Sequence, residues 1–536
     1  MEQKEIQKIP IVVGVTGHRQ IREEDKDLLR EAVRKKLSDL RSQFPHSPLR
    51  MLTSLCEGGD LLCADVAEEL GIPLLAALPR PLSDYERDFS EAGKINLSRH
   101  LKRAEKVFVA PPAEAIPPEG TTRNFEFREA GIYVASHCHL LLALWDGACG
   151  TKAACGTAEA VGFALSGNFQ PVSGMTLHFE KSAAVIHIFT PRGSHTEKKA
   201  GTSEILGDLE NVLGNLRKTD SFNRDLETVP ADFTPETGEI PESGPSLLRM
   251  NLIRQEAGYL SRREAKRYRR VLLLLAVSGA LLAFSFLLYD EAGVLRMILP
   301  VGVLLIAAWI FRRSALRSEC HRKYIEYRVL AECLRVQTFL CYAGSGLNVT
   351  ELLNWTQQEE TAWVMNALLS LSPEDAPGET HDIRVLWVDT QRDYHRKAAV
   401  RVEKKLRISE CIIKASLILS ISLYLGALIF ELTGGALTSR PLIFLPDPAR
   451  FRTALGILLG TVSAVTLFIS GYYGKLSLPR RLSDHRKMER FYEKMSAHMT
   501  ACGQTDELLR LLAREELTEN GNWCSYQRDN APEFDF

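Results

Sequence analysis

The chain has 536 residues with 66 basic and 67 acidic side chains, so its formal net charge is −1. This balance excludes the strongly basic class of nucleic-acid binders, and we expect no nucleic-acid partner. The 11 cysteines are scattered without a CxxC pair or a Cys/His zinc spacing, which indicates reduced, buried thiols in a cytosolic compartment and no metal site. The mean hydropathy of −0.09 predicts a large aqueous part and a small membrane part.

Apolar strand-like segments alternate with helix-like segments in the first third of the chain. The strand-like segments are continuously apolar, which is typical of a parallel sheet covered on both faces. We therefore expect an α/β, Rossmann-like, doubly wound parallel sheet at 8–195. The predicted strands begin near residues 9, 49, 72, 104, 140 and 183, and the helices between them lie near 23–44, 64–71, 85–101, 128–139 and 156–165.

Polar or glycine-rich turns follow several predicted strands. In doubly wound sheets, ligands bind at the carboxyl ends of the strands, where glycines and helix N-termini accept phosphates. A single glycine after a strand also suits an ordinary tight turn, but several such turns at one sheet edge predict a pocket for a nucleotide-derived ligand. Neither a GxGxxG fingerprint nor a P-loop is present. The candidate ligand-binding residues are Gly14, Thr16, Gly17, His18, Arg19, Glu57, Gly58, Gly59, Asp60, Arg128, Trp145, Asp146, Gly147, Gly156, Thr157 and Glu159.

Five of these side chains each allow two interpretations. His18 either contacts the ligand or bonds within its own turn. Arg19 either binds a phosphate in a bidentate manner or pairs with a local glutamate. Glu57 and Asp60 would hold a ribose hydroxyl or a metal ion, although a metal needs more oxygens than the sequence places there. Asp146 is either a ligand contact or a helix-cap residue.

The motifs GVTGHR, SLCEGGDLLCADVAEELGIPLLAALP, DYERDF, LLLALWDG and GTAEAV, in this order, resemble the SLOG superfamily. That superfamily includes DprA-like proteins and the cytokinin-activating LOG phosphoribohydrolases, and the resemblance implies a Rossmann-like fold that binds a nucleotide-derived ligand. LOG enzymes carry a helical arginine and a PGGxGTxxE turn, which Arg128 and Gly156, Thr157 and Glu159 match in part. Here the glycine pair is displaced and the glutamate spacing is one residue shorter, so the resemblance implies ligand binding more than hydrolysis.

The next segment, 196–248, is polar and rich in Pro, Gly, Ser and Thr. It predicts a linker with some helix at 203–226 and a mobile acidic part near 228–247. From about residue 247 we expect one helix to run without a break into the first apolar stretch.

Apolar stretches long enough to cross a bilayer as helices lie at about 271–289, 295–311, 411–432 and 454–473. They predict four membrane spans, and the alternative is two buried helical hairpins in a soluble protein. Basic segments at 261–270, 311–323, 402–407 and 474–487 flank the pairs on one side. The positive-inside rule then predicts an inner-membrane protein with both termini in the cytoplasm.

The two span pairs look like an internal duplication, because His-Arg-Lys follows each pair, at 321–323 and at 485–487. Coincidence between two basic juxtamembrane helices is the alternative. We divide this region into a first two-span unit at 249–345, a cytosolic helical connector at 346–410, a second two-span unit at 411–520 and a tail at 521–536. The tryptophans of the cytosolic helices are interpreted as packing residues.

A SLOG-like domain joined to two-span units also resembles the SLATT group, the SMODS- and SLOG-associating two-transmembrane effectors. This resemblance implies a bacterial antiphage or conflict role in which a nucleotide signal makes the membrane part form a pore or disrupt the membrane. The spans carry few ionisable residues, chiefly Lys414, so we expect a homo-oligomer. The ligand would be a cyclic oligonucleotide or an ADP-ribose or NAD derivative, with no resident cofactor. Alternatives are a membrane-tethered phosphoribohydrolase or N-glycosidase using Arg128 and Glu159, and a ligand-free membrane scaffold.

Overall fold

The computed structural model describes residues 8–112, 122–148, 156–166, 184–192, 199–234, 245–291, 293–353, 361–371, 382–437 and 448–529. The chain forms two compact units. The first, here termed the sheet unit, contains Met1–Gly258, Val329–His381 and Leu509–Gly521. The second, termed the span unit, contains Tyr259–Arg328, Asp382–Leu508 and Asn522–Phe536.

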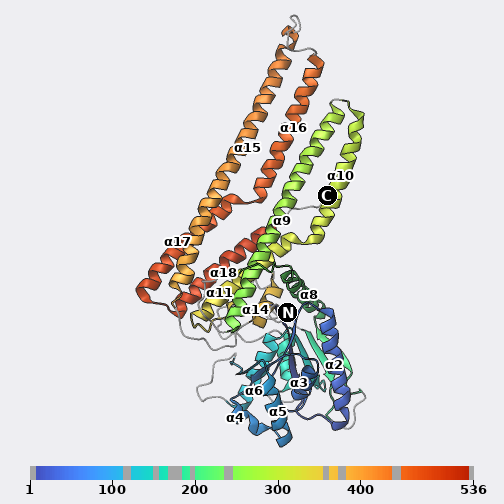
Figure 1. The fold of residues 1–536 in the computed structure, drawn as a ribbon, viewed down its shortest axis with the longest axis vertical. Helices are drawn as coiled ribbons and strands as arrows, with labels where there is room; N and C mark the ends of the chain where they lie inside the picture. The colour runs from blue at the N-terminus through green and yellow to red at the C-terminus, as the bar shows by residue number, and fades with distance from the viewer. Residues whose placement is uncertain are drawn as a thin grey trace. The chain divides into compact units, whose positions relative to one another are not determined.

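The sheet unit is built on a seven-stranded sheet with the order β4-β3-β2-β1-β5-β6-β7 (Figure 1). All neighbouring strands are parallel except β7, which runs antiparallel to β6. The expected doubly wound, mostly parallel sheet is therefore confirmed. The strands are β1 (Ile11–Gly17), β2 (Leu49–Thr53), β3 (Leu74–Leu78), β4 (Lys106–Val109), β5 (Leu140–Trp145), β6 (Ala184–Phe189) and β7 (Ser203–Gly207).

Helices cover both faces of the sheet, because successive side chains of a buried strand point to opposite sides. Ile11, Val13 and Val15 of β1 belong to one core cluster, together with side chains of α2 (Lys26–Gln43), α3 (Gly59–Glu69) and α5 (Glu91–Arg103). Val12 belongs to the other cluster, with α6 (Arg123–His137) and α7 (Thr157–Ser166). The short elements are η1 (Glu23–Asp25), α4 (Leu82–Tyr85), η2 (Glu86–Asp88) and, in the inserted Val329–His381 segment, α12 (Val349–Leu352) and α14 (Ala362–Leu371).

The sheet unit continues past the predicted boundary at residue 195. Residues 203–207 form the edge strand β7 instead of helix, and α8 (Leu209–Leu226) packs Val212 and Leu216 into the core. Asn223 of α8 accepts a hydrogen bond from Ile9 N at 2.9 Å and donates one to Ile9 O at 2.8 Å. This segment is therefore part of the folded domain. Most of the predicted mobile acidic part, 235–244, lies outside the described residues.

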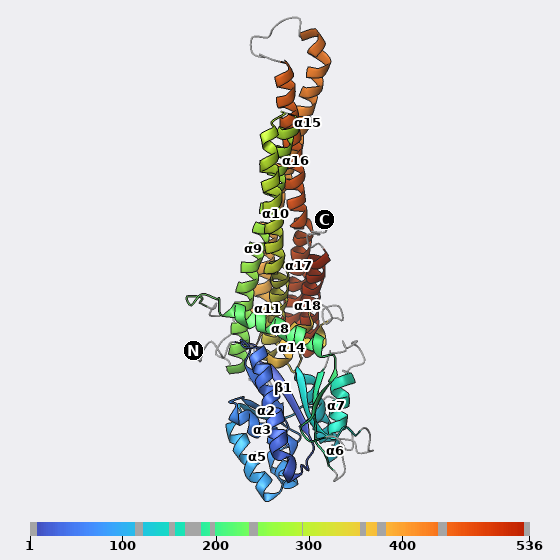
Figure 2. The same cartoon turned by 90° about the vertical axis from the view of Figure 1, so that its right-hand side faces the viewer.

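Long helices make up the span unit (Figures 1 and 2). Within the described residues, three helices are long and apolar enough to cross a membrane, and their apolar windows are 6%, 0% and 0% buried. Within the described residues these windows face outward and are not buried against the rest of the chain, so the three helices could span a membrane. The elements are α9 (Pro245–Asp290), η3 (Leu295–Met297), α10 (Ile298–Ser318), α11 (Cys320–Tyr342), η4 (Arg384–Asp389), α15 (Thr390–Leu437), α16 (Pro448–Lys475), α17 (Leu478–Cys502) and α18 (Asp506–Asp529). Parts of α9, α11 and α18 belong to the sheet unit, namely those up to Gly258, from Val329 onward and from Leu509 to Gly521. The apolar stretch predicted at 295–311 falls mainly in α10, which is not one of the three.

Two glycines let α9 and α16 approach each other closely. A Cβ atom added at Gly279 would lie 2.5 Å from the Phe468 ring, and one added at Gly460 would lie 2.8 Å from Leu287 Cδ1. Small residues at such contacts are typical of helices packed in a membrane. The first predicted span therefore packs against the fourth.

Candidate functional site

A pocket of about 390 Å³ opens at the carboxyl end of the sheet in the sheet unit. It lies beside β1, where β1 is flanked by β2 and β5. Loops after β1, β2 and β6 and the helices α3, α6 and α7 all contribute to it, so the predicted convergence of strand ends occurs. Its lining consists of Val15, Thr16, Gly17, His18, Arg19, Gln20, Ser54, Cys56, Asp60, Phe127, Arg128, Gly131, Val134, Gly156, Thr157, Glu159, Ala160, Phe163 and Arg192.

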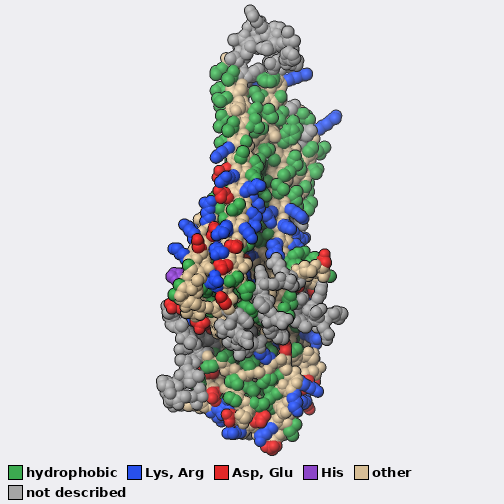
Figure 3. Space-filling view, turned by 60° about the vertical axis from the view of Figure 1, so that its left-hand side comes forward, with side chains coloured by type: hydrophobic (Ala, Val, Ile, Leu, Met, Phe, Trp, Pro, Cys, Tyr) green, Lys and Arg blue, Asp and Glu red, His purple; other side chains and the backbone are tan. Residues whose placement is uncertain are grey.

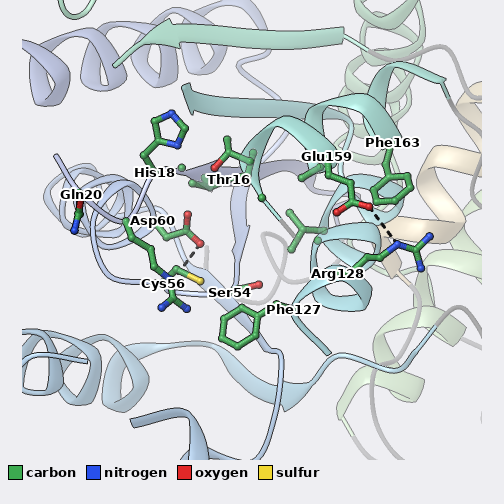
Figure 4. A pocket seen from close by; sticks show the side chains of 18 of the residues that line it. Thr16, His18, Gln20, Ser54, Cys56, Asp60, Phe127, Arg128, Glu159 and Phe163 are labelled. Carbon is green, nitrogen blue, oxygen red and sulfur yellow. Dashed lines mark hydrogen bonds and ion pairs between the residues drawn. The ribbon is translucent and has the colours of Figure 1, made fainter. Parts of the chain in front are cut away.

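His18 is held at one side of this pocket (Figure 4). Its Nδ1 contacts the Arg192 guanidinium, and its Nε2 lies 3.1 Å from both the backbone N and Oδ1 of Asp146. Burial, and then the positive charge of Arg192, lowers the pKa of His18. A neutral His18 therefore fixes the loop after β1. Asp146 also caps its own turn by accepting from Ala148 N at 3.1 Å.

Asp60 lies at the start of α3 and is 3% exposed. Its Oδ2 accepts hydrogen bonds from Thr53 Oγ1 at 3.0 Å and from Cys56 N at 3.3 Å. Burial raises the pKa of Asp60 to about 7, so this carboxyl is partly protonated near neutral pH. These hydrogen bonds connect the turn after β2 to the start of α3. Among the described residues, no group of three or more side chains could hold a metal ion.

Arg128 and Glu159 face each other from α6 and α7, on the side of the pocket opposite His18 (Figure 4). Arg128 Nε lies 3.3 Å from Glu159 Oε1, and Arg128 Nη1 lies 3.2 Å from Glu129 Oε1. The guanidinium also lies over the Phe163 ring, 5.3 Å from its centroid. Arg128 and Glu159, which match the LOG motif in part, therefore form an ion pair with each other.

Arg19 differs from Arg128 in its surroundings. Its guanidinium lies over the Phe127 ring at 5.0 Å from the centroid, and it is exposed. No carboxylate in the described part of the chain lies within ion-pair distance of Arg19, and Glu57 instead accepts from Ser90 N at 3.1 Å. Arg19 also interacts with the Cys56 thiol through a side-chain hydrogen bond, and its remaining donors are available to an incoming anion.

The predicted glycines have different roles. Gly17 and Gly59 lie against each other, since a Cβ at either would lie 2.8 Å from the other's Cα. Gly58 has φ +98°, and a Cβ there would lie 2.3 Å from Arg19 O, so only a glycine fits against the loop after β1 at this position. Gly14 packs against Cys138 inside the sheet. Only Gly156 lines the pocket with open space around it, directly before α7.

The predicted ligand-binding residues fall into two groups, those that line the pocket and those that do not. Thr16, Gly17, His18, Arg19, Asp60, Arg128, Gly156, Thr157 and Glu159 line the pocket. Gly14, Glu57, Gly58, Gly59, Trp145, Asp146 and Gly147 are outside its lining; Trp145 is 6% exposed and its carbonyl accepts from His187.

Sequence reasoning missed several lining residues, above all Arg192, Phe127 and Phe163. Arg192 follows β6, so the rule that found the other strand ends would have found it. The two phenylalanines look like ordinary apolar helix positions, and no sequence signal marks them. No protein-family model matches this chain, and no curated protein matches its sequence.

Proposed function

We propose that the protein is a membrane effector whose sheet unit binds a nucleotide-derived signal and whose long helices then open or disrupt the membrane. The observation that carries the proposal is Arg19, an arginine without a described carboxylate partner at the carboxyl end of β1, in a pocket that also holds the α7 N-terminus. Guanidinium groups and helix N-termini are the phosphate-binding groups of such folds. Phe127 and Phe163 supply aromatic surface for a base.

The membrane part of the proposal has four spans in an inner membrane, with both termini in the cytoplasm. The span that adds to the three long apolar helices is α10, the second along the chain, whose 21 residues include exposed Leu299, Val303 and Trp309, the last 59% exposed. Basic residues at 261–270, 311–323, 402–407 and 474–487 support this orientation. The spans hold few ionisable side chains, which supports assembly of several copies around any pore.

The resemblance to SLOG and SLATT proteins supports an antiphage or conflict role. As a switch, the signal must favour the active state by about 5.5 kcal/mol for a nearly complete transition. Cyclic oligonucleotides and ADP-ribose or NAD derivatives suit a pocket that offers both aromatic and guanidinium contacts.

Thermal unfolding of the full-length chain in detergent, with a panel of nucleotide signals, tests ligand binding. A signal at a hundred times its dissociation constant adds about 2.7 kcal/mol to stability. Arg19→Ala should weaken binding by about 10- to 100-fold, because a charged hydrogen bond is lost. Arg87→Ala, 78% exposed and outside the pocket, is the matched control.

A ligand identified in this way is then added to liposomes that contain the chain and an encapsulated dye. Dye release that requires both the ligand and Arg19 supports the effector. Binding without release would overturn the effector while leaving the pocket assignment intact, and absence of binding across the panel would overturn both.

The Arg128–Glu159 ion pair favours one second candidate, a nucleotide N-glycosidase or phosphoribohydrolase with Glu159 as acid/base. Its test is release of free base from nucleoside monophosphates or NAD by the full-length chain. Release that disappears in Glu159→Gln would support the enzyme, and no release from the unmodified chain would exclude it.

A further inference from the structure

Positively charged side chains from several helices gather in the span unit, on residues that lie outside the predicted apolar stretches. Figure 3 shows Lys and Arg side chains collected where the apolar helix surface ends. We term one group of them the arginine cluster. It consists of Arg269 of α9, Arg328 of α11, Arg401 of α15, and Arg480 and Arg481 of α17.

Aromatic rings contact two arginines of this cluster. The Arg328 guanidinium lies 3.9 Å from the Trp523 ring centroid, and that of Arg480 lies 4.0 Å from the Tyr526 centroid. Trp523 and Tyr526 are three residues apart on α18 and therefore share one helix face. A cation–π contact does not itself neutralise a guanidinium, and the carboxylate of Asp484 lies 4.0 Å from Arg480 Nε.

Arg481 is half-buried and lies between these groups and α15. No carboxylate among the described residues lies within ion-pair distance of Arg481 or Arg401. Neighbouring arginines of the same helices do have partners, as Arg396 has in Glu489 at 3.0 Å. A partly buried charge without a counter-charge is unfavourable, which makes this location unusual.

His485 lies beside the same arginines. It lies four residues after Arg481 on α17, and its Nδ1 lies 3.1 Å from Nδ1 of His395 on α15. Burial, followed by the charges of Arg481, Arg328 and Arg401, lowers the pKa of His485 to about 4. His485 is therefore neutral at physiological pH, and the charge of the site comes from the arginines.

The first turn of α17 adds to the same field. It contains no acidic residue, although helix N-termini favour them, and it carries Arg480 and Arg481 instead. Ser477 precedes the helix but does not cap it, since its hydroxyl donates to Tyr526 Oη at 2.7 Å. The helix dipole and the guanidiniums thus both attract an anion at this point.

We propose that the arginine cluster binds a phosphate group at the point where α16 passes into α17. An anionic phospholipid headgroup and inorganic phosphate offer the same chemistry, namely oxygens that accept paired guanidinium hydrogen bonds. The site shares no residue with the pocket of the sheet unit. The phosphate-binding proposal therefore does not depend on which signal the pocket binds.

The test uses the full-length, delipidated chain in a non-ionic detergent and follows its thermal unfolding. Short-chain phosphatidylglycerol, inorganic phosphate and chloride are compared at one ionic strength. We expect a Tm rise of about 2–4 °C with a phosphate-bearing ligand and none with chloride. A rise with phosphatidylglycerol alone assigns the site to lipid, and a rise with inorganic phosphate as well assigns it to any phosphate. Absence of a rise with both overturns the proposal.

Arg481→Gln should abolish the rise, and Arg317→Gln should keep it. Arg317 is the matched control because it lies four residues before His321, as Arg481 does before His485, and it is exposed. Without phosphate, Arg481→Gln should leave Tm unchanged or raise it, because an uncompensated charge is removed; a purely structural arginine would lower it. An equal rise in Arg481→Gln and the unmodified chain overturns the proposal. If Arg481→Gln does not fold, Arg481→Lys, which keeps the charge but loses the paired donors, should show a reduced rise, and an undiminished rise overturns the proposal.

Discussion

The first helical repeat, α9–α10–α11, and the second, α15–α16–α17, share one order of elements and one contact. In the first, the His321 ring lies 4.4 Å from the ring of Tyr268 on α9. In the second, the His485 ring lies 6.2 Å from that of Tyr394 on α15. Each histidine opens a His-Arg-Lys triplet and lies near a tyrosine ring of the preceding long helix, and the duplication itself stays a prediction.

The two repeats differ in how the arginine of the triplet is neutralised. Arg322 lies 2.5 Å from both Glu319 and Glu326, which belong to the first repeat's own exit-helix segment. Arg486 instead reaches Glu403 on α15 at 3.0 Å. The repeated pattern thus specifies the packing twice, whereas the charge partners follow from nearby residues that are not repeated.

The largest expected effect is that of Arg322→Gln. Glu326 is 2% exposed and lies 2.5 Å from Arg322, so removal of Arg322 takes the closer of two arginines from a buried carboxylate, the other being Arg528 at 4.0 Å. We expect a loss of about 3 kcal/mol of unfolding free energy, measured by denaturant unfolding in detergent. Arg486→Gln, whose ion pair is exposed, should lose at most about 1 kcal/mol. Equal losses would show that the repeats do not differ in this respect.

A smaller effect concerns pH and should be shared by both repeats. Burial is the main cause that lowers the pKa of His321 and of His485 to about 4, below the ordinary value of 6.5. The unfolded chain therefore binds more protons between these values, and stability should fall as the pH drops from about 6.5 towards 4. We expect roughly 2 kcal/mol per histidine. His321→Gln and His485→Gln should each remove part of the slope in a pH series of unfolding curves, and a slope unchanged in both variants would contradict the shared environment.

The smallest expected effect concerns the two tyrosine–histidine ring contacts, Tyr268–His321 and Tyr394–His485. Tyr268 is half-buried, whereas Tyr394 is 48% exposed. Tyr268→Leu should therefore lose about 1 kcal/mol of aromatic contact energy and Tyr394→Leu about half of that, as measured by thermal unfolding. A larger loss for Tyr394 would mean that the second repeat depends more on this contact than its geometry indicates.

Much of the fold could be predicted because its signals are local. Strands β1 to β6 are mostly apolar, with exceptions such as Arg50, Lys106 and His187, and the long helices are marked by hydropathy and length alone. The edge strand β7 was missed because Ser203–Gly207 is short and mostly exposed. Only its pairing with β6 makes this segment a strand, and that pairing is a tertiary contact.

The candidate site was predictable in position but not in orientation. Parallel strands bring their carboxyl ends to one edge, which placed His18, Arg19 and Asp60 correctly. The direction of each side chain depends on its neighbours, and Glu57 turns away because Ser90, which caps α5, supplies hydrogen-bond donors. Gly58 and Gly59 lie against the backbone of Arg19 and Gly17, at the end of β1. The spacing of glycines in the sequence does not distinguish this packing role from ligand binding.

The aromatic face of α18 has a practical consequence for anyone who shortens or tags this protein. Trp523 and Tyr526 lie in the last turns of α18, and the ring of each contacts the guanidinium of an arginine on another helix. A version truncated before Trp523 would release Arg328 and Arg480 together and change the span unit, even though no apolar stretch had been touched. Affinity tags and fluorescent reporters are therefore better attached through a long spacer or at the opposite end.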